Sequence, residues 1–115
     1  MIRVAGLILL IVTFIALPVN AAQELSPILE KGEQIFSQNC AACHMGGGNV
    51  IRASRTLKIV DLNDHLEAYP KDPLEAIEHQ IEDGKNAMPA YAGKLSEEEI
   101  IAVASYVEQQ AEQGW

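Results

Sequence analysis

The most constraining feature of this sequence is a pair of cysteines, Cys40 and Cys43, which are separated by two alanines and followed directly by His44. They are the only cysteines among 115 residues, so the chain has no set of several disulfides of the kind that stabilises many small secreted domains. The spacing C-x-x-C-H is the attachment signature of a c-type haem, because two such thiols reach the two vinyl groups of one porphyrin edge. The adjoining histidine then faces the iron. The motif therefore predicts one covalently attached haem, which the rest of the chain must enclose.

Two other kinds of site also use cysteines at this spacing, a redox disulfide and a zinc site. A disulfide redox motif usually lies in a β-α-β context, which this sequence does not show. A zinc site needs about four ligands, and the only other histidines, His65 and His79, lie in acidic segments that we expect to be solvated helix faces. Haem attachment is therefore the favoured interpretation.

The hydrophobic pattern predicts an all-α domain, because apolar residues recur at three- and four-residue spacings and no segment alternates as a strand does. Start and stop signals place four helices: one from Ser26 with Pro27 first, one over 59–69, one over 73–83, and one from Ser96 onward. We expect the first of these helices to bury Ile28, Leu29, Gly32, Ile35 and Phe36, and the last to bury Ile100, Ile101, Val103, Ala104, Val107 and Ala111.

Gly32 stands inside the predicted buried face of the first helix, where glycine costs about 1 kcal/mol of helix propensity relative to alanine. We therefore expect the first and last helices to cross closely at Gly32, with Phe36 and Tyr106 filling the contact. Two loops separate the helices: residues 45–56, which contain three consecutive glycines, and residues 84–93, which contain Met88 and Pro89.

Met88 is the candidate for the second axial ligand of the iron, because it lies in a loop stiffened by the following Pro89. A thioether opposite an imidazole raises the reduction potential. Met45 is too close to His44 to reach the opposite haem face, and His79 is expected to face solvent. With both axial positions filled, no site remains for oxygen, peroxide or substrate, and electron transfer is the expected activity. Displacement of Met88 would instead give a five-coordinate sensor or peroxidase.

The first residues have the form of a cleaved signal peptide, with Arg3 near the start, an apolar run over 4–17 and small residues around Ala21. We expect cleavage after Ala21 or Ala22, which leaves residues 22–115 as one exported domain with no permanent membrane anchor. The apolar run is shorter than the roughly 18 to 20 residues of a spanning helix. The formal net charge of −8 makes nucleic acid and anionic membrane surfaces improbable partners.

Several segments together resemble the cytochrome c6 family, the class I c-type cytochromes of the thylakoid lumen. The matching pieces are N-C-A-A-C-H-M-G-G-G-N-V (39–50), T-L-K (56–58), G-K-N-A-M-P-A-Y (84–91) and the closing Gly114-Trp115. The resemblance implies a fold of about four helices around one haem c, with thioethers from Cys40 and Cys43 and with His44 and Met88 as axial ligands. It also implies that Gln80 lies near the haem and keeps the potential high.

The same resemblance implies a carrier of single electrons, not an enzyme. Members of the family pass electrons from cytochrome f of the cytochrome b6f complex to photosystem I, and in cyanobacteria also to a terminal oxidase, so a periplasmic or lumenal carrier that feeds an oxidase is the alternative. We expect a monomer. The chain departs from the family at Lys94, where an arginine implicated in docking to photosystem I is common, and at Arg52 and Arg55, which either pair with haem propionates or are solvated.

Overall fold

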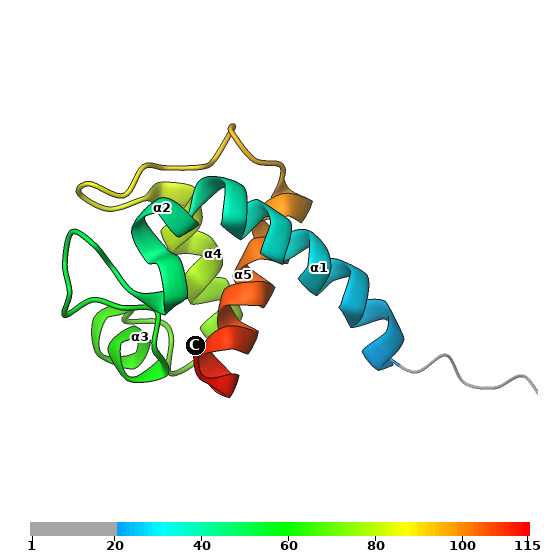
Figure 1. The fold of residues 1–115 in the computed structure, drawn as a ribbon, viewed down its shortest axis with the longest axis horizontal. Coiled ribbons are helices and arrows are strands. Elements are labelled where there is room, and N and C mark those ends of the chain that lie inside the picture. Colours follow the sequence, from blue (N-terminus) through cyan, green and yellow to red (C-terminus); the bar gives the residue numbers. More distant parts are fainter. Residues whose placement is uncertain (1–20) are drawn as a thin grey trace, which may run out of the picture.

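The computed structural model of the chain describes residues 21–115, and in this range it has helices and loops but no strand. The elements are α1 (Ala21–Asn39), the single turn α2 (Ala41–His44), the 3-10 turn η1 (Met45–Gly47), α3 (Ile59–His65), α4 (Pro73–Asp83) and α5 (Glu97–Gln113) (Figure 1). The all-α prediction is confirmed, and four of the helices are longer than one turn. The predicted leader, residues 1–21, lies outside the described residues apart from Ala21. None of the described helices has the length and apolar character needed to cross a bilayer.

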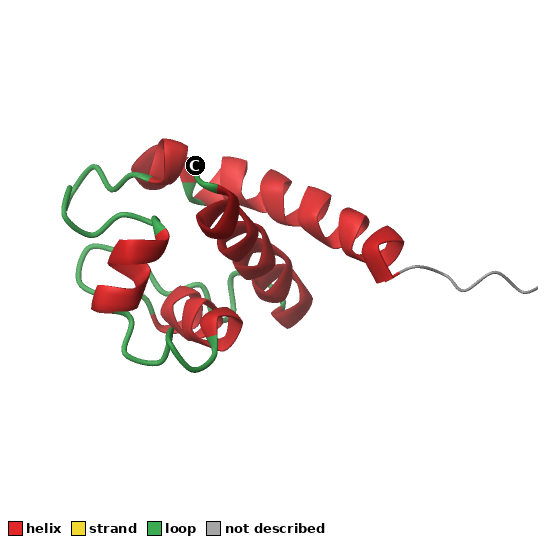
Figure 2. Cartoon of the chain, turned by 90° about the horizontal axis from the view of Figure 1, so that it is seen from below, coloured by secondary structure: helices red, strands yellow, loops and turns green. Residues whose placement is uncertain are grey.

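Helices α1 and α5 cross and form the largest helix–helix contact of the fold. Helix α4 packs against α5 (Figures 1 and 2). The close approach expected at Gly32 is confirmed, because a Cβ atom placed there would lie 2.1 Å from the carbonyl oxygen of Ala102. Phe36 and Tyr106 fill the crossing as predicted, with ring centroids 5.4 Å apart. The ring of Trp115 joins them, with its centroid 5.4 Å from that of Phe36. The sequence did not predict this contact.

The core collects apolar side chains from α1, α3, α4 and α5, together with the ring of Tyr69, which lies between α3 and α4 in the chain and is 3% exposed. Two predicted core residues are exposed instead: Ile28 (41%) on α1 and Ile101 (37%) on α5. Val103 and Val107 lie at the centre of the buried face of α5, and each residue turns the helix by about 100°, so Ile101, two residues before Val103, points to the opposite side. Ile28 belongs to the first half of α1, and Figure 1 shows that this end of the helix extends away from the rest of the fold.

The predicted start of the first helix at Ser26 is wrong. Within the described residues the helix spans Ala21–Asn39, and Pro27 lies inside it rather than in its first position. Proline there removes one N–H donor, but the preceding Ala-Ala-Gln-Glu-Leu consists of strong helix formers that extend the helix upstream.

The helix predicted over 59–69 is also too long, since α3 ends at His65. Leu66 is extended (ψ 104°), and the chain then turns so that Tyr69 enters the core. The burial of one large aromatic side chain thus outweighs the continuation of a short helix.

Helices α4 and α5 begin where their capping residues predicted. The Asp72 carboxylate accepts a hydrogen bond from the Glu75 N–H at 3.1 Å. Ser96 and Glu99 form the reciprocal capping box, with hydrogen bonds of 3.1 and 3.0 Å. Gly84 ends α4 with a positive φ of 64°. The loop that carries Met88 therefore runs between the end of α4 and the capped start of α5.

Candidate haem-binding site

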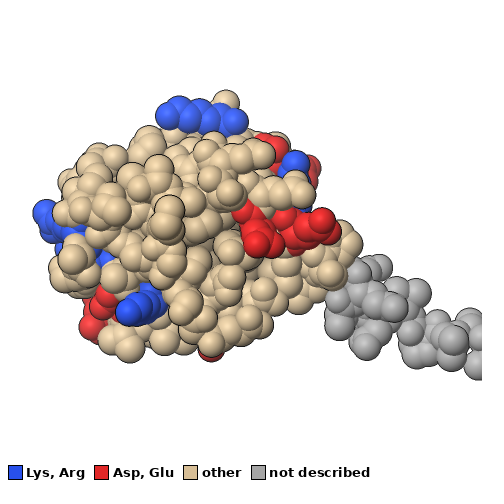
Figure 3. Space-filling view, in the orientation of Figure 1, with Lys and Arg blue, Asp and Glu red and all other residues tan. Residues whose placement is uncertain are grey.

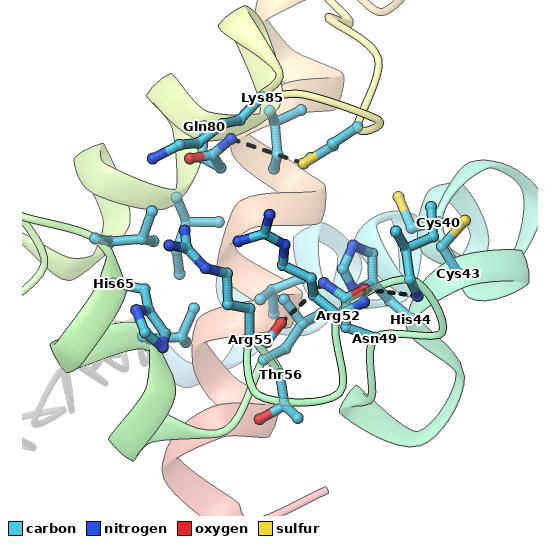
Figure 4. A pocket seen from close by; sticks show the side chains of 18 of the residues that line it. Cys40, Cys43, His44, Asn49, Arg52, Arg55, Thr56, His65, Gln80 and Lys85 are labelled. Carbon is cyan, nitrogen blue, oxygen red and sulfur yellow. Dashed lines mark hydrogen bonds between the residues drawn. The ribbon is translucent and has the colours of Figure 1, made fainter.

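One pocket contains all five residues that the sequence analysis assigned to the haem (Figure 4). Cys40, Cys43 and His44 line it from the end of α1 and from α2, and Gln80 and Met88 line it from α4 and the following loop. The two rival axial ligands lie elsewhere. Met45 is 76% exposed, and His79 stands on the outer face of α4 between two glutamates at 3.4 Å each.

The orientation of the His44 ring is set by the glycine-rich turn that follows it. Its Nδ1 lies 2.8 Å from the carbonyl oxygen of Gly48. Gly46 and Gly47 have positive φ values of 62° and 74°, which bring that carbonyl back toward the ring. With Nδ1 engaged by the backbone, Nε2 is the nitrogen left to bind a metal.

The surroundings of the Cys40 thiol favour an uncharged sulfur. Cys40 is half-buried, and burial, followed by the neighbouring Cys43, raises the pKa of the Cys40 thiol to about 11. The two sulfurs are not joined in a disulfide. A neutral thioether suits this environment, whereas a thiolate is penalised by it.

Met88 is held in the pocket by the hairpin-like turn after α4. Backbone hydrogen bonds of 3.0 Å run in both directions between Lys85 and Met88, and the Tyr91 N–H donates to the Ile81 carbonyl at 2.9 Å. Gly84 is required here, because a Cβ atom at this position would lie 2.5 Å from the carbonyl oxygen of Met88. The Gln80 amide Nε2 lies 3.8 Å from the Met88 sulfur (Figure 4).

The walls between the two groups of ligands are apolar, which suits a porphyrin ring. They are built by Phe36, Leu57, Leu62, Leu66, Ile77, Ile81, Val103 and Val107. Among residues 21–115 no three His, Cys, Asp or Glu side chains come together as a zinc site would require. The donor set and the apolar walls therefore fit a haem bound through two thioethers, an imidazole and a methionine sulfur.

Three basic side chains also line the pocket, and Figure 4 shows two of them, Arg52 and Arg55, extending into the space between Gln80 and His44. Lys85 is the third. The loop that carries the arginines is organised by Asn49, whose amide donates to the Arg55 carbonyl at 2.9 Å and accepts from the Arg52 N–H at 2.8 Å. Sequence reasoning did not single out Asn49, although asparagine after three glycines is a known signal for a side-chain-supported turn.

His65 is an exposed residue of α3, as expected. Although exposed, it lines the pocket, and its Nε2 lies 3.1 Å from the Ser54 carbonyl. Close by, Thr56 hydrogen bonds to the Asp61 carboxylate through both its side chain and its backbone, and these bonds lower the pKa of Asp61. Helix α3 is thus tied to the loop that carries the arginines.

Trp115 closes the far side of the cysteine segment. Its ring occupies the space that a Cβ atom on Gly47 would need, 2.2 Å away, and its Nε1 donates to the Leu57 carbonyl at 2.8 Å. No periodicity in the sequence points to this contact, because its partners are far away along the chain.

Comparison with known proteins gives one consistent result. The sequence model of the family described as cytochrome C oxidase, cbb3-type, subunit III matches residues 27–107. Cytochrome c6 of Bumilleriopsis filiformis is 53% identical over 87 residues, covering 76% of this chain and 96% of the relative. Cytochrome c6 of Parathermosynechococcus lividus is 52% identical over 87 residues, covering 76% and 95%.

The fold agrees with these relatives. The crystal structure of cytochrome c6 from the diatom Phaeodactylum tricornutum aligns with a TM-score of 0.72 at 49% identity, covering 76% of this chain and 98% of that one. Since about half of the aligned residues are identical across nearly the full length of these proteins, the chain belongs to the cytochrome c6 family of electron carriers and is not an enzyme.

Proposed function

We propose that this protein carries single electrons in the thylakoid lumen, from cytochrome f of the cytochrome b6f complex to photosystem I. The observation that carries the proposal is that His44 and Met88 line one apolar pocket together with both cysteines. This combination supports a haem c whose iron is bound on both sides by the protein.

In this proposal Cys40 and Cys43 hold the haem covalently, while His44 through Nε2 and Met88 through its sulfur are the axial ligands. A haem bound in this way supplies a reversible one-electron change between ferric and ferrous iron. The arrangement leaves no open position for oxygen, peroxide or substrate. The 2.8 Å contact between His44 Nδ1 and the Gly48 carbonyl fixes the ring and makes the imidazole a better donor.

Gln80 acts on the other side of the pocket. Donation of its amide N–H toward the Met88 sulfur, at 3.8 Å, draws electron density from the thioether and so favours the ferrous state. Arg52 and Arg55 add positive charge beside the pocket, which suits the carboxylates of the haem propionates. Both effects support a high reduction potential.

Partners are expected to dock at the mouth of the pocket. Ile51 and Ala87 line it and are exposed, and Val50 beside them is 72% exposed. A small apolar rim of this kind suits brief encounters, since transient redox interfaces bury less than about 1,200 Å². Lys94 keeps the positive charge of the arginine common in the family but lacks its planar fork, so docking to photosystem I is expected to be weaker.

The test is a redox titration of purified holoprotein. We expect a midpoint potential at or above that of cytochrome f, and a value well below it would exclude the relay to photosystem I. Reduction of flash-oxidised photosystem I by the protein, compared with its oxidation by a terminal oxidase, then identifies the acceptor. Ready binding of carbon monoxide by the reduced protein at neutral pH would contradict ligation by Met88.

A further inference from the structure

The loop that carries Met88 is fastened mainly to the helix that precedes it. Its backbone bonds run from Tyr91 to Ile81 at 2.9 Å and from Ala92 to Glu82 at 3.2 Å, in addition to the reciprocal pair between Lys85 and Met88. These bonds fix Met88 relative to α4. They do not fix it relative to the cysteines and His44, which belong to the opposite wall of the pocket.

A single hydrogen bond makes that second connection. The Tyr91 hydroxyl donates to the backbone carbonyl of Asn39 at 2.9 Å. Among the hydrogen bonds of the described residues, it is the only one between residues 84–95 and residues 21–58. It joins the loop to the residue directly before Cys40.

The Asn39 carbonyl is available because it lies at the end of α1. In a continuing helix it would accept from the Cys43 N–H, but that N–H donates to the Cys40 carbonyl instead, at 3.1 Å. The Tyr91 hydroxyl therefore satisfies a terminal carbonyl of α1 from a distant part of the chain. The bond gives the Asn39 carbonyl a donor and the Tyr91 hydroxyl an acceptor.

The Tyr91 ring is also held in place. It is half-buried, it lines the pocket, and the Lys94 ammonium lies 5.7 Å from its centroid. A cation over the ring face at this distance is attractive. The hydroxyl is thus presented to Asn39 by a side chain with few alternative positions.

We propose that Tyr91 is a positioning residue, whose bond to Asn39 keeps the Met88 loop seated against the cysteine segment and so keeps the thioether on the iron. The proposal rests on the assignment of His44 and Met88 as axial ligands. If the bond is removed, α4 is the only element described here to which the loop remains hydrogen-bonded, and Met88 leaves the iron more often. A small exogenous ligand then competes with it more successfully.

The experiment compares the holoprotein with its Tyr91→Phe and Tyr106→Phe variants. Tyr106→Phe is a matched control, because it removes a hydroxyl that accepts from Gln110 Nε2 at 3.0 Å within α5, away from the loop. Imidazole is titrated into the ferric proteins while the weak near-infrared band of thioether ligation is followed. Chemical unfolding midpoints are measured in parallel.

We expect Tyr91→Phe to bind imidazole about fivefold more tightly than the unmodified protein, the factor that corresponds to one hydrogen bond of ordinary strength. Tyr106→Phe should leave the imidazole affinity unchanged, even where its unfolding midpoint falls. If Tyr91→Phe and the unmodified protein bind imidazole equally, the inference is overturned. Absence of the near-infrared band in the unmodified protein would instead overturn the Met88 assignment itself, so the two failures are distinguishable.

Discussion

At the scale of single residues, Gly32 shows how one missing side chain sets the packing of two helices. A Cβ atom there would lie 2.1 Å from the Ala102 carbonyl oxygen and 2.8 Å from Cβ of Tyr106. Both obstacles belong to a rigid helix, so neither can rotate out of the way. The distance between α1 and α5 at their crossing therefore depends on the absence of a side chain at this position.

Replacing Gly32 with alanine should destabilise the holoprotein by about 1 to 3 kcal/mol, the usual cost of overpacking a close contact. Helix propensity alone predicts the opposite sign, a gain of about 1 kcal/mol. Guanidinium unfolding at equilibrium measures the difference. Ser37→Ala, at an exposed position of the same helix, is the control and should be neutral or slightly stabilising. A Gly32→Ala variant that is more stable than the unmodified protein would contradict the close crossing.

The residues of the site show what a sequence can reveal at this scale. The predicted Cys40, Cys43, His44, Gln80 and Met88 do line one pocket. The cysteines, His44 and Met88 could be chosen from their own chemistry and spacing, whereas Gln80 was implied only by the family resemblance. The roles of Asn49, Tyr91 and Trp115 were not predicted. The Tyr91 hydroxyl, for example, meets a backbone carbonyl 52 positions away, and no local pattern encodes such a contact.

At the scale of elements, carboxylates gather where α4 meets α5. Burial raises the pKa of Glu108, and the nearby Glu112, Asp72 and Glu78 raise it further. The pKa of Glu78 is likewise raised, first by burial and then by neighbouring acids. A carboxyl whose pKa is higher in the folded state stabilises the fold when protonated, and this contribution is lost as the pH rises through that pKa.

Glu108→Gln should therefore stabilise the holoprotein at pH 7 by about 0.5 kcal/mol, in the range found for like-charge pairs on a helix. The gain should vanish below the ordinary glutamate pKa, because Glu108 is then protonated in the folded and unfolded states alike. Unfolding curves at pH 7 and pH 4 check both statements.

Glu98→Gln is the matched control for this change. It removes a carboxylate from the first turn of the same helix, where negative charge interacts favourably with the helix dipole. The control should lower stability slightly at pH 7. A gain in stability in both variants would show that the lower overall negative charge is responsible, and not the repulsion between carboxylates where α4 meets α5.

The ends of the helices show which helix boundaries can be predicted from the neighbouring residues alone. Asp72 and Ser96 cap α4 and α5, and these starts were predicted correctly. Helix α3 has no capping side chain at its C-terminal end, where Leu66 is extended, and this end was predicted four residues too late. Where a side chain satisfies the end of a helix, the sequence contains the boundary, and elsewhere tertiary packing decides it.

At the scale of the whole molecule, the charge is unevenly distributed. The face seen in Figure 3 is largely uncharged, with acidic side chains gathered toward α1 and the start of α5 and basic ones spaced around the edge. Arg52, Arg55 and Lys85 line the pocket, although the chain as a whole carries a formal charge of −8. Among the described residues Asp61 is the only carboxylate that lines this pocket, so most of the acidic excess lies outside it.

We expect this acidic excess to steer the protein toward basic docking sites, so that its rate of association with photosystem I falls as salt is added. Flash-induced kinetics at a series of ionic strengths measure this dependence. A rate that stays flat or rises with salt would show that the acids do not guide productive docking.

Trp115 has a consequence for how the protein is made. Its contacts with Gly47 and Leu57 can form only after the 115th residue has left the ribosome, while the cysteines that they support are synthesised much earlier. The cysteine segment therefore lacks these contacts until the chain has been synthesised as far as Trp115.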